Sequence, residues 1–307
     1  MKVFKRILLL IAVILIITVV YNYSKLNILA GYSAKNTASS VFVAERTLEF
    51  TDENDNNFSP INLADDKIKK DKNLAISSAF GLLTRKALYR KGLGAVLTLD
   101  ESDETATYLV PKRAKPNNIT PFPYGNAAQK DTVFTNLNYD KLNKTVNQIF
   151  AEINKTRAVV VIYKDQIIAE KYADGFTKNS KILGWSMTKS IVGTLFGVLQ
   201  HQQKLHVQDK APINAWKNDE RNQITINNLL QMNSGLEWDE DYNTISDVSK
   251  MLFLERDMTK IQIDKPFVGK PNETWNYSSG TTDLLSGILR NQFKTHQEYL
   301  DFWYTNL

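Results

Sequence analysis

The hydrophobic and polar positions of the chain first reveal an apolar segment near the N-terminus. Residues 7–20 are apolar except for one threonine, and they follow a basic start that contains Lys2, Lys5 and Arg6. Such a pattern is typical of a secretory signal or a membrane anchor. Because no small-x-small cleavage site follows, we expect an uncleaved signal anchor, a transmembrane helix, over residues 1–25. A cleaved signal is the alternative.

The positive-inside rule gives this anchor a direction. Basic residues that flank a membrane span stay on the cytoplasmic side. The basic start therefore predicts that the rest of the chain lies on the extracytoplasmic side of the membrane.

Residues 26–130 have weaker patterns, and we treat them as an N-terminal extracytoplasmic region. Residues 39–50 alternate imperfectly between apolar and polar and predict a strand, whereas residues 51–60 are acidic and rich in asparagine and predict a loop. Residues 92–99 predict a strand between glycines. Four prolines within residues 111–123 predict an extended surface linker that ends this region near residue 130.

The remaining residues, 131–307, have the clearest periodicity. Apolar positions over 138–153 recur at helical spacing, and two β-branched runs at 158–163 and 167–172 predict an antiparallel hairpin. From residue 184 onward the pattern is mostly helix and loop. This order predicts an α+β protein with an antiparallel sheet and a helical block. A sheet of two strands is not stable alone, so we expect it to be incomplete.

Composition narrows the chemistry. The chain has 307 residues, no cysteine, three histidines and a formal charge of +5. Without cysteine there is no thiolate nucleophile and no thiolate metal ligand, and no His-Glu-x-x-His sequence is present, so we expect neither a metal nor a cofactor. Basic residues are scattered among acidic ones without an aromatic platform, which argues against nucleic-acid binding.

The strongest candidate for chemistry lies at Gly184-Trp185-Ser186-Met187-Thr188-Lys189. A long apolar run, 191–199, follows it and predicts a buried helix. If the helix begins near Ser186, the Lys189 amine shares a face with the serine hydroxyl, because positions i and i+3 are neighbours. A serine becomes a nucleophile when a base takes its proton. The alternative is a helix cap beside a solvated lysine.

Two further segments accompany this pair. Gly269 to Gly280 form a turn with aromatic residues that leads into a helix over 282–293, and it carries Tyr277, whose phenol could relay protons. Residues 225–235 predict a helix capped by Thr225 and ended by Gly235. The acidic segment 238–242 reads as a solvated loop. No Gly-x-Ser-x-Gly elbow is present, which disfavours a Ser-His-Asp hydrolase.

With these residues in place, the sequence resembles the serine hydrolases of the penicillin-recognising superfamily, in the branch of class C β-lactamases, esterases and 6-aminohexanoate-dimer hydrolases. Ser186-Met187-Thr188-Lys189 matches the Ser-x-x-Lys motif. Tyr277-Ser278-Ser279 takes the place of Tyr-x-Asn, with serine instead of asparagine. The segments 221–236 and 238–242 are similar to the stretch between the two motifs. The resemblance implies a β-lactamase/transpeptidase-like fold over residues 131–307.

The resemblance also implies roles. Ser186 would be the nucleophile, Lys189 the base and Tyr277 the proton relay, in the hydrolysis of a small amide, ester or peptide through an acyl-enzyme. Tyr242, Ser279 and Trp185 would contact the substrate. The serine at position 279 fits the oligomer hydrolases and esterases better than the β-lactamases.

A second departure concerns the end of the chain. The family's third motif, Lys-Thr-Gly or His-x-Gly on a sheet strand, has no match between Gly280 and Leu307. We therefore expect a chain that is incomplete at its C-terminus, with impaired activity, since the loss of one oxyanion donor costs about 10²–10³ in rate. A membrane-anchored sensor that binds penicillin or peptides without turnover, or an inactive relative, is the alternative function.

Overall fold

The structure, a computed structural model, shows two compact units. One combines Met1–Arg113 with Leu183–Leu307, and the other is Ala114–Ile182. The predicted boundary at residue 130 and part of the proline-rich linker lie outside the described residues, so neither can be compared with the structure. The structure describes residues 2–113, 119–129 and 132–307.

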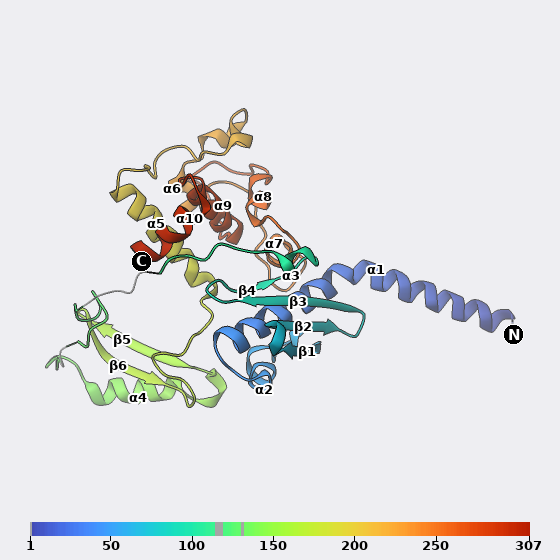
Figure 1. Ribbon diagram of the computed structural model, residues 1–307, viewed down its shortest axis with the longest axis horizontal. Helices are drawn as coiled ribbons and strands as arrows, with labels where there is room; N and C mark the ends of the chain where they lie inside the picture. The colour runs from blue at the N-terminus through green and yellow to red at the C-terminus, as the bar shows by residue number, and fades with distance from the viewer. Residues whose placement is uncertain (1, 114–118, 130–131) are drawn as a thin grey trace. The chain divides into compact units, whose positions relative to one another are not determined.

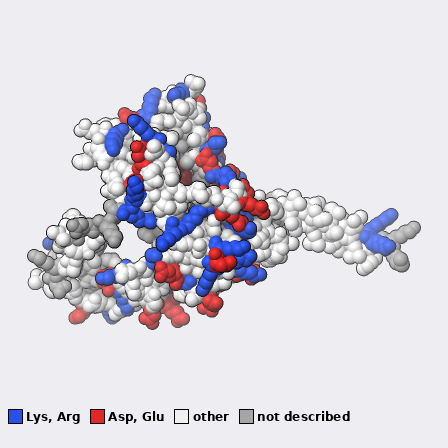
Figure 2. All heavy atoms as spheres, in the orientation of Figure 1, with Lys and Arg blue, Asp and Glu red and all other residues white. Residues whose placement is uncertain are grey.

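The first element is a single long helix, α1 (Lys2–Ala38), which continues into a π-helical turn, Ser39–Val43. Its first part is apolar and exposed, and Figure 2 shows it as a rod without charged side chains beyond a basic cluster at its N-terminal end. It is the one helix in the described part of the chain that is long and apolar enough to cross a membrane.

The strand predicted over residues 39–50 is wrong. After the π-helical turn the chain forms the short helix α2 (Leu48–Phe50) and a second π-helical turn, Thr51–Asp55, in place of most of the predicted loop. The reason lies upstream, where Ala30, Ala34 and Ala38 repeat at helical spacing and are fully buried. This narrow face packs against a sheet and extends the helix through residues whose local pattern is ambiguous.

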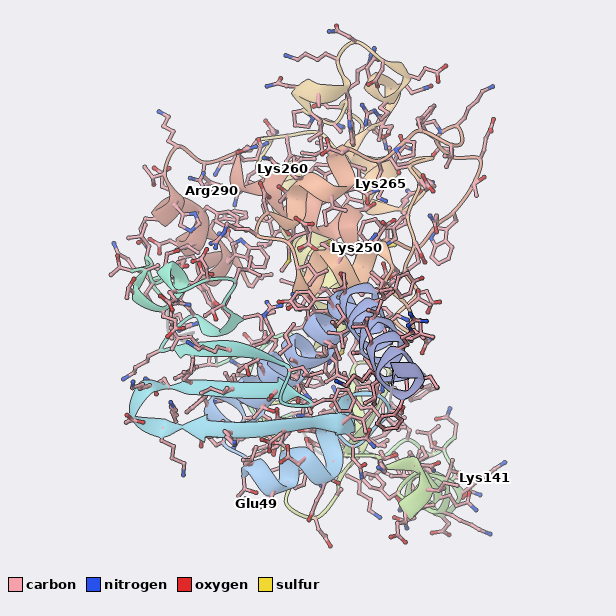
Figure 3. The ribbon with its side chains drawn as sticks, turned by 90° about the vertical axis from the view of Figure 1, so that its right-hand side faces the viewer. Glu49, Lys141, Lys250, Lys260, Lys265 and Arg290 are labelled. Carbon is pink, nitrogen blue, oxygen red and sulfur yellow. The ribbon has the colours of Figure 1, made fainter. Side chains whose placement is uncertain are left out.

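That sheet is a four-stranded antiparallel meander in the order β1-β2-β3-β4. One face of it packs against α1 (Figures 1 and 3). The strand predicted over 92–99 is confirmed as β4. The other strands were not predicted, because β1 is mostly charged and β2 is rich in small polar residues. The four strands of this sheet are β1 (Ala64–Lys69), β2 (Leu74–Ala79), β3 (Leu83–Arg90) and β4 (Gly94–Leu97), and the short helix α3 (Ser102–Thr105) follows them.

The second unit contains helix α4 (Tyr139–Ile149) and a hairpin of β5 (Ala158–Tyr163) and β6 (Gln166–Tyr172). Both elements confirm the predicted helix and hairpin. Lys164 and Asp165 at the turn have φ of 47° and 60°, as a two-residue hairpin turn with matching twist requires. Within the described residues this sheet has two strands.

The helical block of the first unit surrounds one hydrophobic core. Residues Val192, Leu195, Phe196 and Leu199 of α5 pack there against Leu284, Leu285, Ile288 and Leu289 of α9, with Trp216, Leu229 and Phe302. The structure thus has antiparallel sheets together with helices, the α+β class predicted. The helices of the block are α5 (Thr188–His201), α6 (Ile226–Leu230), α7 (Asp247–Phe253), α8 (Met258–Ile263), α9 (Ser279–Arg290) and α10 (His296–Asn306).

Candidate active site

Ser186 lies in a 3₁₀ turn, Trp185–Met187, that leads directly into α5. The turn is closed by the amide of Met187, which donates to the carbonyl of Gly184 at 2.9 Å. Trp185 has a φ of 41°, a left-handed conformation that is uncommon for a bulky residue. Its ring stacks on Tyr32 of α1, with centroids 5.8 Å apart and planes at 13°. This stacking helps hold the turn that presents Ser186 to solvent.

The amine of Lys189 is the centre of the arrangement. Its Nζ lies 3.1 Å from Ser186 Oγ, one helical turn away, and 2.9 Å from Ser279 Oγ at the start of α9. It also lies 4.8 Å from the centre of the Tyr277 ring, within cation–π range. Ser186, Tyr277 and Ser279, which are up to 93 positions apart in the sequence, therefore meet at one nitrogen.

Tyr277 stands on the loop just before α9, whose N-cap residue is Ser278. It presents its ring to Lys189, and its neighbour Trp275 lies 6.2 Å away, centre to centre. Among the described residues, no hydrogen-bond partner is found for the Tyr277 hydroxyl. The Tyr277 ring is thus in contact with Lys189 and Trp275, while its hydroxyl forms no hydrogen bond with another side chain of that part of the chain.

Glu240 joins the site, although sequence reasoning assigned its segment to a solvated loop. One carboxylate oxygen accepts from the Ser279 hydroxyl and, at 2.9 Å, from the Tyr242 hydroxyl. The other accepts from Trp238 Nε1 and, at 2.8 Å, from the Ser279 amide. The carboxylate therefore satisfies a free amide at the start of α9, where the helix dipole favours a negative charge.

Ser279 consequently stands between a cation and an anion. Its hydroxyl oxygen accepts from Lys189 Nζ, while its proton points to Glu240. The result is a continuous hydrogen-bonded chain, Ser186–Lys189–Ser279–Glu240. An asparagine at position 279 could not bond to Lys189 and Glu240 through one group, because its carbonyl oxygen only accepts hydrogen bonds and its NH₂ group only donates them.

Two titratable groups close to Ser279, namely Tyr242 and Asp283, have a raised pKa. Burial and the nearby Glu240 raise the pKa of Tyr242 to about 12, so its hydroxyl stays protonated and donates at neutral pH. Asp283 follows Ser279 by one turn of α9. Burial, with repulsion from Glu240, raises the pKa of its carboxyl to about 6, although the Lys189 ammonium acts in the opposite direction.

A cavity of about 730 Å³ opens beside Ser186. Five of the six predicted site residues line it, namely Trp185, Ser186, Lys189, Tyr242 and Ser279. Tyr277 does not line it, and contacts the amine through its ring. The opposite wall comes from α1 and the β4 region, with Tyr32 and Leu97 among its residues.

This wall is anchored to the helical block of the same unit. The Tyr32 ring lies 5.7 Å from that of Phe253 on α7, and Arg85 of β3 donates to the Phe253 carbonyl at 2.9 Å. Sequence reasoning missed the whole wall, along with Glu240 and Asp283. One signal in the sequence could have indicated Glu240. Trp238 and Tyr242, whose side chains can both donate a hydrogen bond, lie two residues before and two residues after this carboxylate.

In the described part of the chain, no group of three or more histidine, aspartate or glutamate side chains is arranged to hold a metal ion. The side chains of the site present a serine hydroxyl, an amine, a phenol and a carboxylate. Together they can move protons and form a covalent bond, the requirements of nucleophilic catalysis.

Comparison with known proteins gives a family for the C-terminal half of the chain. The family model described as Beta-lactamase matches residues 146–307. No curated protein matches the sequence. Among solved structures, the chain is similar to one described as a 6-aminohexanoate-dimer hydrolase from Bacillus anthracis, with 18% identity and a TM-score of 0.42. The match covers 52% of this chain and 45% of that one, so the chain spans less than half the length of that relative.

Proposed function

The chain belongs to the beta-lactamase family of serine hydrolases, and on this premise we propose that it hydrolyses an amide or ester through an acyl-enzyme at Ser186. One observation carries the proposal. Lys189 Nζ lies within hydrogen-bond distance of both Ser186 Oγ and the Ser279 hydroxyl, which is the geometry of a nucleophile with its base.

The first chemical step is proton transfer followed by attack. Lys189, in its neutral form, takes the proton of Ser186 as the oxygen bonds to the substrate carbonyl carbon. The tetrahedral intermediate collapses when the bond to the leaving group breaks and a proton passes from the Lys189 ammonium through the Tyr277 phenol to that group. Water then attacks the acyl-enzyme and releases Ser186, with the same groups working in reverse.

Lys189 must lose one proton before it can serve as a base, and the structure contains a route for it. The Ser279 hydroxyl accepts a proton from Lys189 and passes its own to Glu240 along the two hydrogen bonds that already exist. Glu240 thereby becomes neutral, and Lys189 becomes a free amine. We assign this role to the Ser279–Glu240 pair, in the place where relatives carry asparagine.

The substrate contacts follow from the same positions. Trp185 and Tyr242 line the same cavity as Ser186 and are proposed to hold the substrate. The Tyr-Ser-Ser sequence at 277–279 supports an activity like that of 6-aminohexanoate-oligomer hydrolases or esterases more than that of β-lactamases. The basic start and apolar first part of α1 support a membrane anchor with an extracytoplasmic hydrolase.

A fluorophosphonate probe with intact-mass analysis tests the proposal. We expect a single adduct on Ser186, none in Ser186→Ala, and none in Lys189→Ala with an unchanged melting temperature. Lys204→Ala, an exposed lysine near the end of α5, is the matched control and should label as the wild type does. Labelling of Lys189→Ala at the wild-type rate would refute its role as base.

The same method separates a hydrolase from a sensor. With an ester substrate in place of the probe, a transient acyl adduct indicates hydrolysis. An adduct that persists for hours would contradict turnover and favour a binding protein that acylates without release.

A further inference from the structure

The membrane-type segment and the wall of the cavity belong to one uninterrupted helix. In α1 the residues from Phe4 to Tyr23 are largely exposed and apolar, whereas Leu29, Ala30 and Ala34 are buried against the sheet. Figure 1 shows the helix running from its projecting N-terminal part into the packed region without a break. The packed C-terminal part of α1 therefore fixes the direction in which its exposed N-terminal part projects.

The same helix reaches the cavity soon after its apolar part ends. Tyr32, Lys35 and Asn36 line the cavity, and Tyr32 stacks on Trp185, the residue before the nucleophile. At 1.5 Å per residue, Tyr32 lies about 14 Å along the axis from Tyr23, the last exposed aromatic of the apolar part. Exposed tyrosines at such a position are typical of a membrane interface. This spacing places the cavity next to the interface.

The cavity itself suits an apolar chain. Most of the surface that lines it is apolar, although the charged side chains of Lys35, Arg90, Asp103, Glu255 and Arg256 also line it. Its volume lies in the range of pockets that enclose small ligands. A hydrocarbon chain that leaves water for such a wall gains about 0.8 kcal/mol per methylene. The residues that form this apolar part are Ala95, Val96, Leu97, Leu99, Leu183, Leu252, Phe253 and Met258.

We propose that the substrate is an amphiphile, an ester or amide that carries a long hydrocarbon chain and enters the cavity from the adjacent membrane surface. This inference rests on the proposed serine hydrolase function and names its substrate class. The continuity of α1 supports it over a freely soluble amide or peptide, because a helix that spans the bilayer and also forms the cavity wall keeps the entrance close to the lipid.

The test compares two fluorophosphonates, one with an ethyl chain and one with a dodecyl chain, on the full chain in lipid vesicles. The rate of Ser186 modification is followed by intact mass. We expect the dodecyl probe to react at least about tenfold faster, since burial of only two methylenes already corresponds to that factor.

Two matched variants remove the effect of probe partitioning into lipid. Leu183→Gln places an amide in the apolar wall, and Leu82→Gln makes the same change at an exposed turn outside the cavity. Leu183→Gln should lose most of the preference for the dodecyl probe, measured as the ratio of the two rates, whereas Leu82→Gln should keep the wild-type ratio.

The outcomes distinguish the two proposals. If neither probe modifies Ser186, the hydrolase function itself fails. If both probes modify it at equal rates, or if Leu183→Gln and Leu82→Gln keep the same preference, the serine is a nucleophile but the amphiphile inference is overturned.

Discussion

At the scale of single residues, Lys189 and Glu240 lie at the two ends of a short chain of hydrogen bonds through Ser279, the proposed proton path. Lys189 contacts two hydroxyls, and Glu240 accepts four hydrogen bonds, two of them from Ser279. A charge-assisted bond of this kind is about twice as strong as a neutral one. The position of Ser279 is therefore held from both sides, and a change at Glu240 should alter chemistry before it alters the fold.

Glu240→Gln tests that position. The glutamine oxygen can still accept from Trp238 and the Ser279 amide, while its amino group must donate to the hydroxyls of Ser279 and Tyr242. The Ser279 hydroxyl then accepts from position 240 and no longer donates to it, so a proton from Lys189 cannot pass through Ser279 to this side chain. We expect the maximal rate of Ser186 acylation to fall about tenfold to a hundredfold, with little change in probe affinity.

The control for this change is Asp241→Asn, on the next residue of the same loop, which should leave the rate unchanged. Ser279→Ala interrupts the same path, so the double variant with Glu240→Gln should react no more slowly than the slower single variant. Additive losses would show that the two residues act independently.

Asp283 makes a prediction about stability and pH. Its carboxyl has a pKa of about 6 in the folded protein, against about 3.9 in an unfolded chain. The folded state thus binds the proton more tightly, so the carboxyl lowers stability above pH 6, and this effect vanishes below about pH 4. Asp283→Asn should raise the free energy of unfolding by about 2 kcal/mol at pH 8 and by little at pH 4.

Thermal or denaturant unfolding at the two pH values measures this difference. Glu273→Gln, at an exposed carboxylate of the loop before Tyr277, should change stability at neither pH. A loss of stability in Asp283→Asn at pH 8 would mean that the carboxylate is held by an interaction that outweighs its burial.

At the scale of elements, the start of α9 brings the site together. Ser278 caps the helix by accepting from the Thr281 amide at 2.9 Å, Ser279 contacts Lys189 and Glu240, and Gly280 lies against the Trp238 ring. A Cβ atom at Gly280 would lie 2.4 Å from that ring and 2.6 Å from Gln262. Because Gly280 has no side chain, the start of α9 and the 238–242 loop can lie in direct contact.

Gly280→Ala should separate these two elements. Overpacking of this kind typically costs about 1–3 kcal/mol of stability, and here it also moves Glu240 away from Ser279. The matched control is Gly193→Ala in α5, where an added Cβ meets no atom within 4 Å. There alanine should stabilise the helix by about 0.5–1 kcal/mol. Equal melting temperatures for the two variants would contradict the contact.

At the scale of the whole molecule, α1 has two roles that divide along its length. Its first part is exposed and apolar, and its last part completes the core that lies over the four-stranded sheet. A chain that starts at Lys25 keeps Leu29, Ala30 and Ala34, so it should stay folded. We expect it to remain soluble, whereas the full chain stays in the membrane pellet after an alkaline carbonate wash.

The mass of the full chain recovered from membranes also decides between an anchor and a cleaved signal. Retention of residues 1–25 supports the anchor. Recovery of the full chain in the soluble fraction, or of a protein that lacks those residues, would contradict it.

Local patterns in the sequence were enough to predict the elements whose signals are local. The β5–β6 hairpin, α4 and the apolar helix after Ser186 were predicted because their periodicity or turn residues are contained within one segment. The pairing of Ser186 with Lys189 was likewise predictable, since residues three positions apart share a helix face. The family resemblance pointed to Tyr277 and Ser279.

Tertiary structure decided the remainder. Residues 39–43 are helical because the alanine face of α1 packs on a sheet that lies later in the sequence. This packing outweighs the weak alternation of apolar and polar residues that predicted a strand there. Glu240 belongs to the site because the Ser279 amide at the start of α9, some forty positions later, donates a hydrogen bond to it. Tyr32 belongs to the cavity because Trp185 stacks on it. Such contacts depend on groups far apart in the chain, and local patterns of hydrophobicity carry no record of which distant group will meet which.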